Sequence, residues 1–178
     1  DASPSSSPKP TEDPKNMSDE KIAAMRNKMW RNKAVSDTYE PGSTFKIITA
    51  AAALEEHLVD GNTKFYCPGF RVVEDRLIKC SNSDGHGPET FTQGVLNSCN
   101  PVFIDIGLKL GYEKFMEYFT AFGLTETTKI ELGGESQSIY YKTKMNNVDL
   151  ATSSFGQGFQ VTPIQLVTAI SAVINGGQ

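Results

Sequence analysis

Ser43 and Lys46 have residue types and a spacing that suit nucleophilic catalysis. A serine hydroxyl is a weak nucleophile until a base removes its proton. Residues three apart on a helix lie on one face with Cβ atoms about 5–6 Å apart, and burial lowers a lysine pKa so that the neutral amine can act as a base. Backbone N–H groups at a helix N-terminus also favour the negative charge of acyl transfer. The pair predicts a serine acyl-transfer site at the start of a helix.

The same Ser-x-x-Lys spacing also begins at Ser6 and at Ser18. Ser6 lies in a segment rich in Pro and Ser, and Ser18 precedes a charged helix in which the lysine would be solvated. Only Ser43 leads into an apolar segment, residues 47–54, that could desolvate the base. On spacing alone, a helix-capping serine followed by a lysine that extends to solvent remains an alternative.

The elements that must position this pair are mainly helical. The apolar periodicity, with Pro at first turns and Gly at ends, predicts helices, and short β-branched runs between turn residues predict strands. The expected helices span residues 19–30, 43–57, 90–98, 101–110, 112–122 and 162–174, and the expected strands span residues 70–73, 76–78 and 129–132. Residues 1–16 are expected to be a disordered or loop segment. The remaining residues, 17–178, suffice for one α+β domain.

Composition restricts the class of partner. The formal net charge of −4 argues against nucleic acid, because phosphate binding needs a surplus of Lys and Arg. No run of about 18 apolar residues is present, so the sequence predicts no membrane-spanning helix. The two histidines, His57 and His86, offer no plausible Ser-His-Asp triad, because His57 follows two glutamates and His86 lies in a Gly-rich loop.

Three longer motifs, in order along the chain, resemble class B penicillin-binding proteins, which crosslink bacterial peptidoglycan. The first is YEPGSTFKI at residues 39–47, preceded by MWRN at 29–32. The second is Ser98-Cys99-Asn100 followed by PVF, which is similar to the family's Ser-x-Asn motif. The third is LATSSFGQG at 150–158 with VTPIQ at 161–165. The Ser-x-x-Lys, Ser-Asp-Asn and Lys-Thr-Gly set is typical of penicillin-binding proteins and class A β-lactamases.

The resemblance implies the mainly helical portion of the transpeptidase fold shared with serine β-lactamases. The family's Lys-Thr-Gly motif has no match, because Lys142-Thr143-Lys144 lacks the glycine and precedes residues 155–158, whereas the family's motif follows them. We interpret Lys142 as a surface lysine and residues 17–178 as a partial transpeptidase domain without that strand. The resemblance also implies a location at the extracytoplasmic face of the bacterial membrane, anchored by a segment outside this chain.

The resemblance assigns roles to four residues. Ser43 would attack the donor stem peptide, Lys46 would take its proton, Ser98 would relay a proton to the leaving group, and Asn100 would hold Lys46 and the substrate amide. The implied partners are peptidoglycan stem peptides, β-lactam antibiotics and cell-wall synthesis proteins, and no catalytic cofactor is implied. A helix-terminal Ser98 and a capping or turn Asn100 remain the structural alternatives.

A second cluster, of possible metal ligands, lies within twenty residues of loop-rich sequence. Cys67, Cys80, Asp84 and His86 offer thiolate, carboxylate and imidazole groups, and four such ligands can form a closed zinc site. Some clostridial-type members of the resembled family appear similar, so a structural zinc is one expectation. A Cys67–Cys80 disulfide and free thiols are the alternatives. Cys99 is interpreted as a packed small residue.

Three functions other than a transpeptidase stay open at this point. A β-lactam sensor domain would be acylated and transmit a signal, and a fragment without Lys-Thr-Gly could be non-catalytic. A class A β-lactamase would need a glutamate that activates water, and no matching Glu-x-x-x-Asn sequence is present. The YEPG and FGQG segments favour the transpeptidase.

Overall fold

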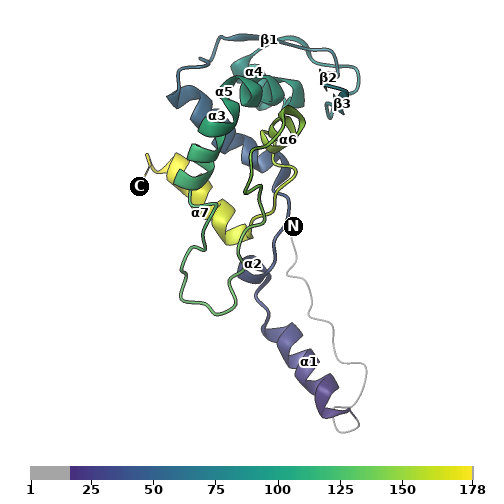
Figure 1. The fold of residues 1–178 in the computed structure, drawn as a ribbon, viewed down its shortest axis with the longest axis vertical. Helices are drawn as coiled ribbons and strands as arrows, with labels where there is room; N and C mark the ends of the chain where they lie inside the picture. Colours follow the sequence, from purple (N-terminus) through teal and green to yellow (C-terminus); the bar gives the residue numbers. More distant parts are fainter. Residues whose placement is uncertain (1–16, 178) are drawn as a thin grey trace.

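The computed structural model describes residues 17–177. Two helices, α3 (Lys46–Glu55) and the long α5 (Asn100–Ala121), pack together at the centre of the body. The shorter α6 (Asn147–Ser153) packs on α5, and α7 (Pro163–Ile174) packs on α3 (Figure 1). A 3₁₀ turn, η2 (Gly42–Phe45), leads into α3. The expected α+β class is confirmed, and the segment 1–16 lies outside the described residues.

The N-terminal helix α1 (Asp19–Trp30) projects away from this body, and none of its residues is buried (Figure 1). It has the predicted bounds because Ser18 caps its first turn, where the acidic Asp19 and Glu20 oppose the positive end of the helix dipole. A short helix, α2 (Lys33–Ser36), follows and contacts α7. After α1 and α2 the chain thus enters the turn that carries Ser43.

A single glycine divides α5 into the two helices that the sequence predicts. Gly111 has φ 80° and ψ 163°, which is not a helical conformation. Only glycine adopts such angles at little cost. The N-terminal half of α5 contributes Phe103 and Ile104 to the core, and the C-terminal half contributes Phe115 and Phe119.

Four aromatic side chains form the centre of the main core. Phe45 lies 4.8 Å from Phe159, 6.0 Å from Phe115 and 6.1 Å from Phe119, measured between ring centroids. These are edge-on and tilted arrangements that aromatic pairs prefer. Phe45 is 1% exposed, so the residue directly before Lys46 in the motif anchors the turn in the core.

The segment before α4 forms two small antiparallel pairs rather than one sheet. β1 (Lys64–Cys67) pairs with β4 (Gly87–Thr90), and β2 (Phe70–Val73) forms a hairpin with β3 (Arg76–Lys79), at the positions of two predicted strands. α4 (Phe91–Leu96) follows β4 directly and begins with a capping box between Thr90 and Gln93. This segment carries most of the predicted metal ligands.

The strand predicted at residues 129–132 is wrong. The carboxylate of Glu135 accepts hydrogen bonds from the backbone N–H of Thr128 (2.6 Å) and of Lys129 (3.1 Å), and Lys129 has φ 59°. In a strand these N–H groups would donate to a neighbouring strand. Here the Glu135 side chain accepts from them instead, so no strand forms. The helix α6, in contrast, was not predicted.

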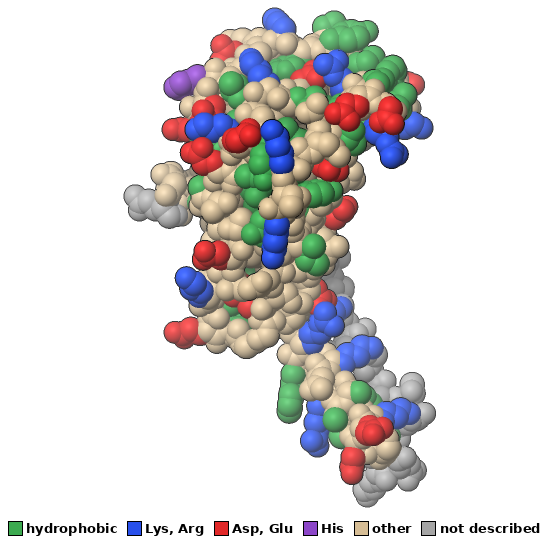
Figure 2. All heavy atoms as spheres, in the orientation of Figure 1, with side chains coloured by type: hydrophobic (Ala, Val, Ile, Leu, Met, Phe, Trp, Pro, Cys, Tyr) green, Lys and Arg blue, Asp and Glu red, His purple; other side chains and the backbone are tan. Residues whose placement is uncertain are grey.

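The surface of the body mixes both charge signs. Figure 2 shows acidic and basic side chains interspersed over the face in view, without a broad basic patch. Among the described residues, no helix combines the length and the apolar character needed to cross a membrane.

Candidate active site

The proposed nucleophile lies at the surface, and the proposed base lies beneath it. Ser43 is exposed within η2, one turn before α3. Lys46 is the first residue of α3 and is only 4% exposed. Solvent therefore reaches the serine, in the 3₁₀ turn, but not the lysine, at the start of the α-helix.

The ammonium group of Lys46 connects the two motifs. Its Nζ donates hydrogen bonds to the backbone oxygen of Ser98 (2.6 Å), to Ser98 Oγ (3.1 Å) and to Asn100 Oδ1 (2.7 Å). The ring of Phe103 lies beneath it, 5.3 Å from Nζ to the centroid. These hydrogen bonds bring Lys46 together with Ser98 and Asn100, which lie 52 and 54 residues further along the chain. That the three side chains act together on Ser43, as the resemblance implies, stays a prediction.

Burial lowers the pKa of Lys46 from 10.5 to about 8, and the nearby Cys80 and Cys99 oppose this shift. Desolvation penalises the charged form of an amine, so the neutral form becomes accessible near physiological pH. This perturbation is the one that a lysine base requires.

Ser98 and Asn100 are held by backbone contacts that the sequence does not reveal. Ser98 has φ 50°, a left-handed conformation that turns the chain between α4 and α5. The N–H of Cys99 donates to the oxygen of Gly94 (2.9 Å), and Asn100 Nδ2 donates to the oxygen of Lys79 at the end of β3 (3.0 Å). Asn100 therefore bridges Lys46 and the β2–β3 hairpin, which is more than the capping role considered as an alternative.

A pocket of about 610 Å³ opens beside Asn100. The β2–β3 hairpin supplies one wall and α6 with its flanking loops supplies the other. Its polar lining includes Arg76, Lys79, Asp149 and Gln157. A cavity of this size with several convergent polar groups can accept a peptide-sized ligand next to the site.

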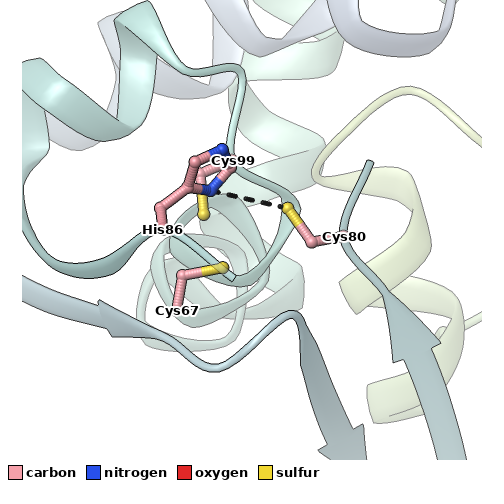
Figure 3. Close-up of side chains that lie close together, drawn as sticks. All are labelled: Cys67, Cys80, His86 and Cys99. Atoms are coloured by element: carbon pink, nitrogen blue, oxygen red, sulfur yellow. Dashed lines mark hydrogen bonds between the residues drawn. The ribbon is translucent and has the colours of Figure 1, made fainter. Parts of the chain in front are cut away.

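Three cysteines and one histidine lie close together, among them Cys99 of the Ser-x-Asn motif (Figure 3). Possible ligand atoms of Cys67, Cys80, His86 and Cys99 all lie within 4.8 Å of one another, and Cys80 Sγ is 3.8 Å from His86 Nδ1. Asp84, which the sequence suggests as a ligand, is exposed and lies outside this group. Cys99, at the start of α5, is buried and lies within it.

The donors fit a metal ion in kind and in burial. Thiolate and imidazole are the preferred ligands of zinc, and all three cysteines are free and buried. A tetrahedral ion with Zn–S bonds near 2.3 Å keeps its ligand atoms roughly 3.5–3.8 Å apart, so the observed group needs only a small contraction. The neighbouring Glu89 is also buried, and its Oε1 has no hydrogen-bond partner within residues 17–177.

The other candidates lie at the surface. His57 follows α3 and is exposed, as the sequence indicates. Lys142 is exposed in a loop rather than on a strand, in agreement with its interpretation as a surface lysine.

Comparison with known proteins agrees with this geometry. The family described as "Penicillin binding protein transpeptidase domain" matches residues 5–178. Stage V sporulation protein D of Bacillus subtilis is 48% identical over 149 residues, covering 83% of this chain and 23% of that protein. Peptidoglycan D,D-transpeptidase FtsI of Escherichia coli is 27% identical over 165 residues, covering 92% of this chain and 27% of that protein.

Among solved structures, a peptidoglycan synthetase from Bifidobacterium adolescentis superposes with a TM-score of 0.79 at 30% identity, covering 85% of this chain and 28% of that one. The chain thus spans about a quarter of the length of these curated relatives. The family match covers nearly the whole sequence, including all three motifs. This chain belongs to the penicillin-binding protein transpeptidase domain family.

Proposed function

We propose that this chain is the part of a peptidoglycan D,D-transpeptidase that carries its nucleophile, base and Ser-x-Asn motif. The observation that carries the proposal is the position of Lys46. A buried amine of lowered pKa, hydrogen-bonded to Ser98 and Asn100, lies one helical turn from an exposed Ser43. Such a nucleophile, base and relay arrangement suits acyl transfer.

In the first half-reaction, Ser43 Oγ attacks the carbonyl carbon of the penultimate D-alanine of a donor stem peptide. Lys46 Nζ accepts the serine proton, and Ser98 relays a proton to the amine of the departing D-alanine. The C–N bond breaks as the Oγ–C bond forms, which leaves an acyl-enzyme. Asn100 supports this step because its Oδ1 holds Lys46 while the polar pocket lies beside it.

In the second half-reaction, an amine from a neighbouring stem peptide attacks the acyl carbon. The ester bond to Ser43 breaks, the new amide crosslinks two peptides, and the serine recovers its proton. A β-lactam follows only the first half-reaction: its ring nitrogen is the leaving group but stays attached, so the acyl-enzyme persists.

The test is the site of acylation in a full-length protein that contains this segment. We expect a labelled penicillin to modify Ser43, located by peptide mapping and mass spectrometry, and we expect Ser43→Ala to remove the label. Ser171→Ala, at an exposed position on α7, is the control that should label normally. An adduct on another residue, or no adduct in the wild-type protein, contradicts the proposal.

We further propose that Cys67, Cys80, His86 and Cys99 hold a structural zinc ion, which would place the chain in a zinc-binding subgroup of the family. All four coordination positions are supplied by protein, so the ion would crosslink the β1–β4 segment to the start of α5 and would not activate water. Because Cys99 lies between Ser98 and Asn100, the crosslink would stiffen the catalytic turn.

Metal analysis of protein purified without added zinc should find about one zinc per chain. Chelation should lower the melting temperature, because binding energy at such a site is folding energy. Cys99→Ser should lose the metal, whereas Asp84→Ala, at an exposed position outside the group, should retain it. Metal-free protein with a single reactive thiol would instead indicate a Cys67–Cys80 disulfide.

The substrate also suggests a location and partners. Peptidoglycan is assembled outside the cytoplasmic membrane, so the proposed activity places this chain at the extracytoplasmic face, together with other cell-wall synthesis proteins. Protease accessibility in intact spheroplasts tests the location.

A further inference from the structure

The turn that carries Ser43 is hydrogen-bonded to a segment more than a hundred residues further along the chain. The N–H of Gly42 donates to the oxygen of Gly156 (2.9 Å), and the N–H of Gly158 donates to Glu40 Oε1 (3.0 Å). These contacts join residues 40–42 to the loop at residues 155–158, hereafter the glycine loop. Glu40 and Gly42, the residues on either side of Pro41, therefore each have a partner in the glycine loop.

Gly156 touches the backbone of Gly42 so closely that no side chain fits between them. A Cβ atom added to Gly156 would lie 2.1 Å from the oxygen and 2.7 Å from the carbonyl carbon of Gly42. Both atoms belong to the peptide group that joins Gly42 to Ser43, so they cannot move without moving the serine. Gly156 also has φ +88°, which favours glycine.

The contacts continue on both sides of the glycine loop. Tyr39 and Val161 exchange two backbone hydrogen bonds, of 3.0 and 3.1 Å. On the far side of the turn, the ring of Phe45 packs edge-on against Phe159 at 4.8 Å between centroids. Residues 156–161 thus bind the backbone before Ser43 and contact the ring of Phe45 after it. Lys46 is bound separately, by the Ser-x-Asn turn.

We propose that Gly156 and Glu40 are positioning residues that fix the direction of Ser43 Oγ relative to Lys46. This inference rests on the proposed function of Ser43 as the acylated residue. Ser43 is exposed, so packing of its own side chain does not orient it, and its direction depends on the peptide group that Gly156 contacts. Neither residue touches the reacting atoms: Gly156 acts through the backbone of Gly42, and Glu40 acts through the N–H of Gly158 in the glycine loop.

The test compares acylation kinetics of variants in a full-length protein that contains this segment, with a labelled penicillin as the probe. Gly156→Ala must displace the Gly42–Ser43 peptide by roughly 1 Å to relieve the overlap, and a displacement of this size lowers the acylation rate constant by about 100-fold. The dissociation constant of the non-covalent penicillin complex should change little. Gly123→Ala is the matched control: it has a similarly positive φ of +74°, its added Cβ would have nothing within 4 Å, and it lies outside the Ser43 turn and the glycine loop.

Glu40 provides a second variant that does not threaten folding, because its side chain is exposed. Glu40→Ala removes the acceptor for the Gly158 N–H, and we expect roughly a threefold to tenfold slower acylation from the less restrained turn. Glu40→Gln keeps an acceptor oxygen and should restore the wild-type rate constant within about twofold. A purely structural role would lower the melting temperature of these variants. It would not lower the acylation rate constant while leaving the dissociation constant of the penicillin complex unchanged.

The results distinguish the two proposals. If the wild-type protein is acylated on Ser43 but Gly156→Ala and Gly123→Ala slow acylation equally, or Glu40→Ala reacts at the wild-type rate, the positioning role is wrong and the proposed function stands. If the wild-type protein is not acylated on Ser43, both are overturned.

Discussion

The lowered pKa of Lys46 predicts how acylation should depend on pH. With a pKa of about 8, about a tenth of the Lys46 side chains are neutral at pH 7, whereas an unperturbed lysine with a pKa of 10.5 would be neutral in about one molecule in 3000. Burial therefore increases the population of competent base about 300-fold at pH 7. Below pH 8 most of the amine is protonated and cannot accept the proton of Ser43, so acylation must become faster as the pH rises.

The expected profile is specific enough to measure. Between pH 6 and pH 9 the neutral fraction of a group with a pKa near 8 rises about 90-fold. The second-order rate constant for acylation by a labelled penicillin should rise by a similar factor and level off above pH 9. Lys46→Arg should be inactive at every pH, because guanidinium stays protonated. Lys144→Met, which replaces an exposed lysine, should leave the profile unchanged.

Two outcomes would refute this reasoning. A rate constant that is flat or decreasing from pH 6 to pH 9 would mean that Lys46 does not act as the free amine. A rise that continues without a plateau toward pH 10.5 would mean that burial does not lower its pKa.

Three further predictions concern stability, each measured by denaturant unfolding of a full-length protein that contains this segment. Phe45→Ala removes the ring at the centre of the aromatic core and should cost about 3–5 kcal/mol; a cost below 1 kcal/mol would contradict the central position of this ring. Gly107→Ala adds a Cβ 2.4 Å from that of Ser154 and should cost about 1–3 kcal/mol, whereas Gly133→Ala, with nothing within 4 Å of the added atom, should be near neutral. Thr162→Ala removes the cap of α7 and should cost about 1 kcal/mol; an unchanged midpoint would show that Gln165 alone suffices.

Local sequence signals predict most helices of this fold, because their ends are marked by residues with one dominant preference. Ser18 sets the start of α1, and Gly111 separates the two halves of α5. The helix α6 has only its cap as a signal: Asn146 accepts a hydrogen bond from the Asp149 N–H, but the helix sequence, NVDLATS, is short and rich in poor helix formers. Packing on α5 supports it, because Gly107 lacks a side chain and lets Ser154 approach closely.

The candidate site was predictable where side-chain type and spacing define it, and not where the backbone does. Ser43, Lys46 and the Ser-x-Asn motif could be named from sequence. The Ser98 carbonyl that accepts from Lys46 could not, because every residue has a carbonyl group. Cys99 was overlooked as a possible ligand because its catalytic neighbours suggested only a packing role. Asp84 was chosen instead on proximity in sequence, which does not determine the direction of a loop side chain.

The hydrogen bonds that assemble the site also constrain when it can form. Lys46 and Ser98 are separated by 52 residues, and Glu40 and Gly158 by 118. Contacts between such distant residues form late in folding, because the chain must close a long loop before any of them is made. In a newly made chain the Ser43 turn therefore lacks these partners until residues up to Val161 are in place. If the proposed function holds, modification of Ser43 by a penicillin would report on the formation of these long-range contacts during refolding.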